Sequence, residues 1–73
     1  MYDYSKLLGK IIEVFGSQGK FATEMGLSER SMSLKLNNKK AFKQPEIQLA
    51  ISILGLTEMD IPDYFFKKKV QFV

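Results

Sequence analysis

Apolar side chains recur at helical spacing along most of the chain, and small or turn-forming residues separate the segments. The first pattern predicts a helix that starts after Asp3 and ends near Phe15, with one apolar stripe formed by Leu8, Ile11, Ile12 and Phe15. Gly16 then suits the left-handed position that closes a helix.

Two short helices are expected next. Ser17 is a good N-cap for the second helix, whose inward residues are predicted to be Phe21, Ala22 and Met25. Gly26 ends this helix after barely two turns, and Ser28 caps a third helix. The third helix carries Met32 and Leu36 at i, i+4 spacing, and the pair Asn37-Asn38 stops it.

The second half of the chain predicts a fourth helix and a short fifth one. Pro45 suits the first turn of the fourth helix, whose buried stripe is Ile47, Ala50, Ile51 and Leu54. Thr57 and Asp60 resemble a capping box for the fifth helix, which Pro62 is expected to break. The aromatic run at residues 64–66 either folds back onto the bundle or forms an exposed patch that binds a partner.

These segments predict one all-α domain of five helices over residues 1–66. Residues 67–73 form a basic C-terminal tail that begins with three lysines. Its end alternates weakly between apolar and polar residues, which is compatible with a short strand.

The two short helices contain the residues that a helix-turn-helix needs. Ala22 allows the helices to cross closely, Gly26 tolerates a positive φ in the turn, Leu27 plugs the turn and Met32 follows five positions later. We therefore predict a helix-turn-helix over residues 17–38, formed by helices 2 and 3. An ordinary αα corner in a small bundle is the structural alternative.

In a helix-turn-helix protein the third helix enters the major groove of DNA and the second crosses the backbone. Gln18 and Lys20 would then assist phosphate binding, and Arg30 would read guanine. The predicted DNA- or repressor-binding face comprises Gln18, Lys20, Ser28, Glu29, Arg30, Ser33, Leu34, Asn37, Lys39 and Lys40.

The charged residues of this region favour two different kinds of partner. Every ionisable side chain from Arg30 to Pro45 is basic, namely Arg30, Lys35, Lys39, Lys40 and Lys43, which favours nucleic acid. Glu29 does not fit that reading, because phosphates repel a carboxylate unless it accepts from a cytosine amine. Leu34 would face outward as an apolar residue, which suits thymine methyl groups or a protein surface.

Composition excludes several classes of function. The chain has 73 residues, 45% hydrophobic and 26% charged, with a net charge of +3. It contains no Cys and no His, so zinc sites and the common acid–base and nucleophilic pairs are missing. We therefore expect no enzyme activity, no cofactor, no metal and no small-molecule substrate. Without a membrane-spanning run or a signal peptide, we expect a cytoplasmic protein.

Several runs of the sequence resemble a known family: Tyr2-Asp3-Tyr4-Ser5-Lys6-Leu7, Gly9-Lys10-Ile11, Phe15-Gly16, Gly26-Leu27-Ser28-Glu29-Arg30, Ser33-Leu34-Lys35-Leu36-Asn37, Asp60-Ile61-Pro62 and Tyr64-Phe65-Phe66. They are similar to the modulator-of-repression (MOR) antirepressors of temperate lactococcal phages, within the lambda-repressor-like, Cro-like superfamily. The resemblance implies a compact five-helix domain that binds the N-terminal, DNA-binding domain of a phage repressor and masks it. It also implies that Glu29 pairs with arginines of the repressor and that Leu34 is buried against it.

Two functions therefore remain open. The first is an antirepressor that acts on a lysis–lysogeny switch by binding its cognate repressor. The alternative is a Cro-like regulator that binds double-stranded operator DNA directly through the third helix. The alternative requires a homodimer to span two half-sites, and the tail is the visible candidate for dimerisation.

Overall fold

The computed structural model describes residues 1–70, and its helices follow the predicted order. They are α1 (Ser5–Phe15), α2 (Gln18–Glu24), α3 (Glu29–Leu36), α4 (Gln44–Ile53), the 3-10 helix η1 (Glu58–Asp60) and α5 (Ile61–Phe65). The predicted all-α fold with five α-helices is confirmed, because no strand occurs within residues 1–70. None of the helices there is long and apolar enough to span a membrane.

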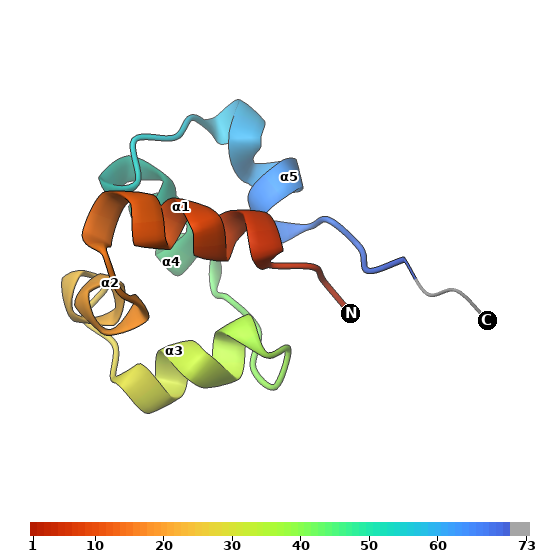
Figure 1. Cartoon of the computed structure of the whole chain (residues 1–73). Helices are drawn as coiled ribbons and strands as arrows, with labels where there is room; N and C mark the ends of the chain where they lie inside the picture. The colour runs from red at the N-terminus through yellow and green to blue at the C-terminus, as the bar shows by residue number, and fades with distance from the viewer. Residues whose placement is uncertain (71–73) are drawn as a thin grey trace.

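The hydrophobic core draws side chains from all five α-helices. Its completely buried members include Leu7 and Ile11 of α1, Phe21 of α2 and Met32 of α3. Each such side chain contributes about 1.5–3 kcal/mol by leaving water. Figure 1 shows α3 at the edge of the molecule, joined to the rest by the short turn after α2 and the loop before α4. The side of α3 that carries Met32 therefore faces the core, and its other side is open to solvent.

The apolar stripe of α1 differs from the prediction. Leu7 and Ile11 are buried, whereas Ile12 is 52% exposed, and Leu8 and Phe15 lie only partly buried against the core. Apolar residues occupy both positions 7 and 8 and both positions 11 and 12, so helical spacing alone fits either of two stripes. Tyr4 decides between them, because it is buried one turn before Leu7 and extends the observed stripe.

The turn between α2 and α3 has the predicted local chemistry. Ser17 caps α2 by accepting a hydrogen bond from the Lys20 backbone N–H (3.2 Å), and Ser28 caps α3 by accepting from the Ser31 N–H (3.0 Å). Gly26 has a φ of +70°, the left-handed conformation that glycine adopts without a Cβ clash. The Leu27 N–H then donates to the Ala22 carbonyl (2.9 Å), which satisfies one of the last carbonyls of α2.

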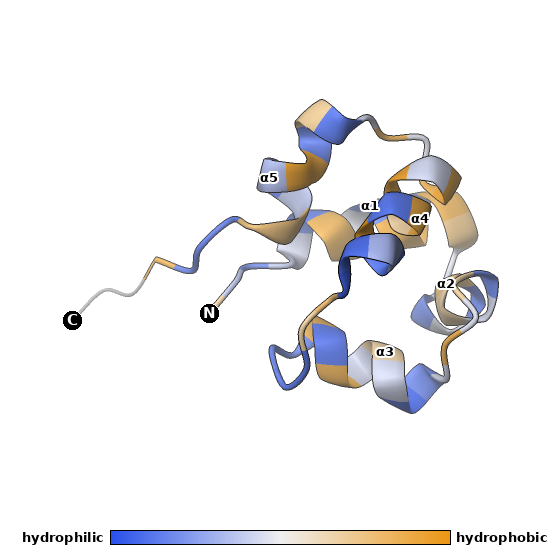
Figure 2. Cartoon of the chain, turned by 180° about the vertical axis from the view of Figure 1, so that it is seen from behind, coloured by the Kyte–Doolittle hydropathy of each residue, from blue (hydrophilic) through white to orange (hydrophobic). Residues whose placement is uncertain are grey.

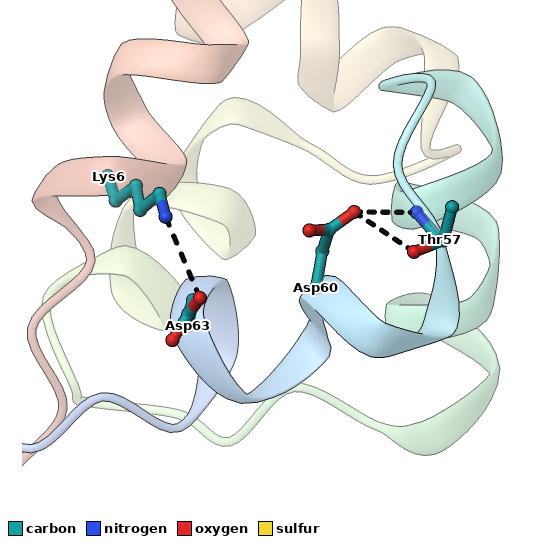
Figure 3. A network of polar contacts seen from close by, with 4 residues as sticks. All are labelled: Lys6, Thr57, Asp60 and Asp63. Atoms are coloured by element: carbon teal, nitrogen blue, oxygen red, sulfur yellow. Dashed lines mark hydrogen bonds and ion pairs between the residues drawn. The ribbon is translucent and has the colours of Figure 1, made fainter.

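The expectation that Pro62 breaks the fifth helix is wrong. Pro62 lies in the first turn of α5, where a missing N–H costs no helical hydrogen bond. The predicted capping box forms, because the Asp60 carboxylate accepts from the Thr57 N–H (2.9 Å) and hydroxyl (3.1 Å) (Figure 3), but it caps the 3-10 helix η1 and not α5, which follows directly. Figure 3 also shows the exposed ion pair, 3.7 Å between Lys6 Nζ and Asp63 Oδ2, that joins α1 to α5.

The N-terminal segment is held between the tail and the end of α3. Tyr2 forms an isolated antiparallel bridge with Lys68, and the side-chain amide of Asn38 bonds both the N–H (2.8 Å) and the carbonyl (2.9 Å) of Tyr2. Both ends of the described chain therefore lie on one side of the molecule (Figure 1). The short strand expected in residues 67–73 amounts to this single bridge within the described part, and residues 71–73 lie outside the described residues.

Lys35 does not belong to the exposed basic region in which the sequence places it. Its side chain is only 4% exposed, and its ammonium group pairs with Glu46 Oε1 (2.9 Å) and donates to the Ala41 carbonyl (3.0 Å). The pair connects α3 to the start of α4. The aliphatic part of the Lys35 side chain passes through the interior, and the two polar contacts compensate the charge of its ammonium group. This explains how a lysine is tolerated there.

The carboxylate of Glu46 has two favourable partners, Lys35 and Lys43. Burial by itself raises the pKa of Glu46, but the hydrogen bond from the Lys43 N–H and the Lys35 ammonium outweigh burial, and the pKa is lowered below its usual value. A carboxyl group with a lowered pKa stabilises the folded state above its unfolded pKa. That stabilisation is lost as the pH falls through the folded value.

We predict that Lys35→Met destabilises the fold, because Glu46 loses its buried counter-ion. The expected cost is about 1–3 kcal/mol, less than the roughly 3–5 kcal/mol of a fully buried pair, since Glu46 retains its bond to the Lys43 N–H. Urea denaturation followed by circular dichroism measures this change. The double variant Lys35→Met/Glu46→Gln removes both charges and should recover part of the loss; no recovery would contradict a role for the ion pair.

Acid should weaken the domain partly through Glu46. Wild type is expected to be more stable than Glu46→Gln at pH 7, and the difference should shrink by pH 3, because protonated Glu46 no longer attracts Lys35. Glu13→Gln is the matched control, since Glu13 forms an exposed pair with Lys10 worth about 0.3–0.5 kcal/mol. A Glu46→Gln difference that stays constant with pH would rule out this linkage.

Candidate functional site

The ten predicted binding residues lie on α2, α3 and the loop that follows. Gln18 and Lys20 stand in the first turn of α2, and Lys39 and Lys40 lie in the loop after α3. Ser28, Glu29, Arg30, Ser33, Leu34 and Asn37 occupy α3 or its two caps. Figure 2 shows the loop with Lys39 and Lys40 as a hydrophilic segment beside the end of α3. The structure thus arranges these residues along one helix and the segments next to it, and their part in binding stays a prediction.

Glu29 lies against the first turn of α2. A Cβ built on Gly19 would sit 3.2 Å from Glu29 Cδ and would collide with a carboxylate oxygen. The absence of a side chain at Gly19 therefore creates the space that the Glu29 carboxylate occupies. This contact, which the sequence did not indicate, places a negative charge beside Gln18 and Lys20, which are predicted to assist phosphate binding.

Three of the predicted polar residues are already engaged in local hydrogen bonds. The Asn37 amide donates to the Ser33 carbonyl (2.8 Å) and to the Ser33 hydroxyl (3.3 Å). The Ser28 hydroxyl serves as the N-cap of α3. These side chains stabilise α3 and its ends, so a base or phosphate would have to compete with existing partners.

The charged members of the face remain exposed. Lys20, Arg30, Lys39 and Lys40 are exposed, and no ion pair involves any of them within residues 1–70. Glu29 is exposed as well, so the face carries both signs of charge. Lys35, by contrast, points inward to Glu46 and is lost to this surface.

Leu34 is the apolar member of the face. It is partly exposed and does not belong to the described hydrophobic core or to the residues packed against it. Its carbonyl accepts hydrogen bonds from the N–H groups of Lys39 (2.8 Å) and Lys40 (3.2 Å). The loop that carries these two lysines is therefore fixed to the backbone of Leu34.

Nothing in the described residues suggests metal binding. No group of three or more acidic side chains is placed to hold a metal ion within residues 1–70. The arrangement offers a surface of mixed charge with an apolar member, which suits recognition of a macromolecule.

Comparison with known proteins identifies relatives for this fold and sequence. The model of the DUF739 family, described as a protein of unknown function, matches residues 1–68. No curated protein matches significantly. Among solved structures, the chain is similar to the modulator of repression (MOR) of the temperate bacteriophage TP901-1 from Lactococcus lactis. The two share 57% sequence identity, with a TM-score of 0.81 over 96% of this chain and 95% of that chain.

The match extends over nearly the whole of both chains, so it includes every described helix and the predicted binding face. The resemblance to modulators of repression that was inferred from the sequence is thereby confirmed. The chain belongs to the DUF739 family and is a homologue of the MOR protein of phage TP901-1.

Proposed function

We propose that this chain is a phage antirepressor, which binds the DNA-binding domain of its cognate repressor and masks it in a lysis–lysogeny switch. The similarity to a modulator of repression supports a role in such a switch. We further propose that the chain acts in the cytoplasm, without catalysis, through the helix-turn-helix formed by α2 and α3. The observation that carries the proposal is the position of the Glu29 carboxylate.

Glu29 favours a protein partner over DNA. A carboxylate against the first turn of α2 repels a phosphate that approaches the same place. The surface with which a repressor reads DNA is rich in Arg and Lys, so the same carboxylate attracts it. Opposite charges across an interface also orient the partners and accelerate their association.

Leu34 supports the same partner. Apolar side chains at the centre of a protein interface gain most when water is excluded from them. Leu34 is partly exposed outside the core, on the same helix as Glu29 and Arg30. A partner that covers α3 would bury Leu34 and surround it with charge pairs.

Direct operator binding is the second candidate function. Lys20, Arg30, Lys39 and Lys40 are exposed cations on or near α3, and they favour a polyanion. Against this, Asn37 and Ser33 bond each other, which leaves fewer groups to contact bases and phosphates. The loss of Lys35 to the interior reduces the basic surface further.

The variant Glu29→Gln separates the two functions. Under the antirepressor proposal it should weaken binding to the repressor's DNA-binding domain about tenfold or more, a change of about 1.4 kcal/mol, because a partner arginine loses its counter-charge. Affinity for operator DNA should hardly change. Leu34→Ala should weaken repressor binding by a similar factor. Calorimetric titration with the purified repressor domain measures both effects.

Glu58→Gln serves as the matched control, since Glu58 is an exposed carboxylate on η1, on the opposite side of the molecule from α3 (Figure 1). It should bind the repressor domain as wild type does. If Glu29→Gln instead strengthens operator binding and leaves repressor binding unchanged, the Cro-like function is the correct one.

Gly19 is expected to act as a positioning residue for Glu29. In Gly19→Ala the new methyl group displaces the Glu29 carboxylate, which is the flexible end of a side chain, so the fold should survive. Replacing a helical glycine should even stabilise the domain by about 0.5–1 kcal/mol, while repressor binding weakens.

The double variant Gly19→Ala/Glu29→Gln makes this test specific. Both changes act through one carboxylate, so the second should add little to the loss of repressor binding caused by the first. Thermal melts of all variants check the fold. Repressor binding by Gly19→Ala that equals wild type would show that the position of the Glu29 carboxylate is irrelevant.

A further inference from the structure

An apolar groove lies between the N-terminal segment, the loop after α3 and α5. It consists of two hollows of about 320 and 390 Å³ that share Phe42, Ile47 and Phe66 as walls. Each is close to the lower end of the roughly 300–1,000 Å³ range of ligand pockets. The groove begins at Lys39 and Lys40, which end the predicted binding face, and continues away from α3.

Aromatic rings form rigid walls for the groove. Phe42 packs edge to face on Tyr4 (5.4 Å between ring centroids) and on Phe65 (5.2 Å), which holds it in place. Phe66 packs in the same way on Tyr2 (5.6 Å) but remains 48% exposed. An exposed aromatic ring beside a preformed hollow gains about 25 cal/mol for each Å² of apolar surface that a partner covers.

The rim of the groove is positively charged. Lys39 and Lys40 line one hollow directly and are exposed, and Lys43 follows in the same loop. Glu46 is the sole acidic residue between positions 38 and 48, and Lys35 neutralises it from the interior. The rim therefore attracts negative charge, while the walls attract an apolar side chain.

We propose that this groove binds an acidic peptide segment that carries one large apolar side chain. The apolar side chain fills the space between Phe42 and Phe66, and flanking carboxylates pair with Lys39 and Lys40. This site is additional to the antirepressor function proposed above, which uses the outward face of α3. A peptide fits better than a nucleic acid, because the rings pack edge to face on one another and present few flat faces for base stacking.

A synthetic peptide tests the proposal with the full chain. The probe is a capped Asp-Glu-Trp-Ala-Asp-Glu peptide, and because the chain contains no Trp, the tryptophan emission of the peptide reports binding directly. We expect saturable binding that weakens as salt is added. A Lys-Lys-Trp-Ala-Lys-Lys peptide should bind at least about tenfold more weakly, because the basic rim repels it.

Two variants locate the site, and two others serve as controls. Phe66→Ala and Lys40→Glu should each weaken binding of the acidic peptide about fivefold or more, and both residues are exposed enough for the fold to tolerate the change. Met59→Ala is the apolar control, because Met59 is 90% exposed and does not line the groove. Glu29→Gln should leave peptide binding unchanged while it weakens repressor binding, which keeps the two proposals separable.

Four results would overturn the proposal: no binding of the acidic peptide, equal binding of the basic peptide, unchanged binding by Phe66→Ala, or displacement of the peptide by oligothymidine at lower concentration. The last result would instead identify the groove as a site for single-stranded nucleic acid. Circular dichroism of each variant confirms that altered binding does not come from unfolding.

Discussion

The position of α3 depends on a small number of inward contacts. Among them the buried ion pair between Lys35 and Glu46 has the strictest requirement, because a charge removed from water must be paired. Met32 and Leu36 bury the apolar side of α3, while Lys35 carries a charge into the interior that must be paired there. The Lys35 ammonium also bonds the Ala41 carbonyl, so one side chain connects α3, the loop after it and the start of α4. The outward face of α3 and the groove beside it are both oriented by this contact.

Local features of the fold follow from the sequence, because they depend on neighbours along the chain. Ser17 and Ser28 cap the helices they precede, and Gly26 takes the left-handed conformation that its turn requires. The prediction that Pro62 breaks the fifth helix fails for a local reason as well, since proline suits the first turn of a helix as readily as it breaks the interior of one.

Contacts between distant positions were not predictable in this way. In the sequence Lys35 resembles a surface cation, and only the fold shows that the loop after α3 places Glu46 beside it. Gly19 likewise resembles an ordinary residue at a helix start, and only the fold shows that α3 places the Glu29 carboxylate against it. The sequence did single out Glu29 and Leu34 as unsuited to a dedicated DNA reader. The structure adds their placement, because the Glu29 carboxylate lies against the first turn of α2 and Leu34 lies outside the core.

Nuclear magnetic resonance tests residue by residue whether the outward face of α3 binds a repressor. Isotope-labelled chain would be titrated in parallel with the repressor's DNA-binding domain and with operator DNA. We expect the repressor domain to shift the amide signals of Glu29, Arg30 and Leu34, whereas operator DNA at equal concentration should leave them nearly unchanged. Strong shifts of the same amides with operator DNA, and none with the repressor domain, would contradict this expectation.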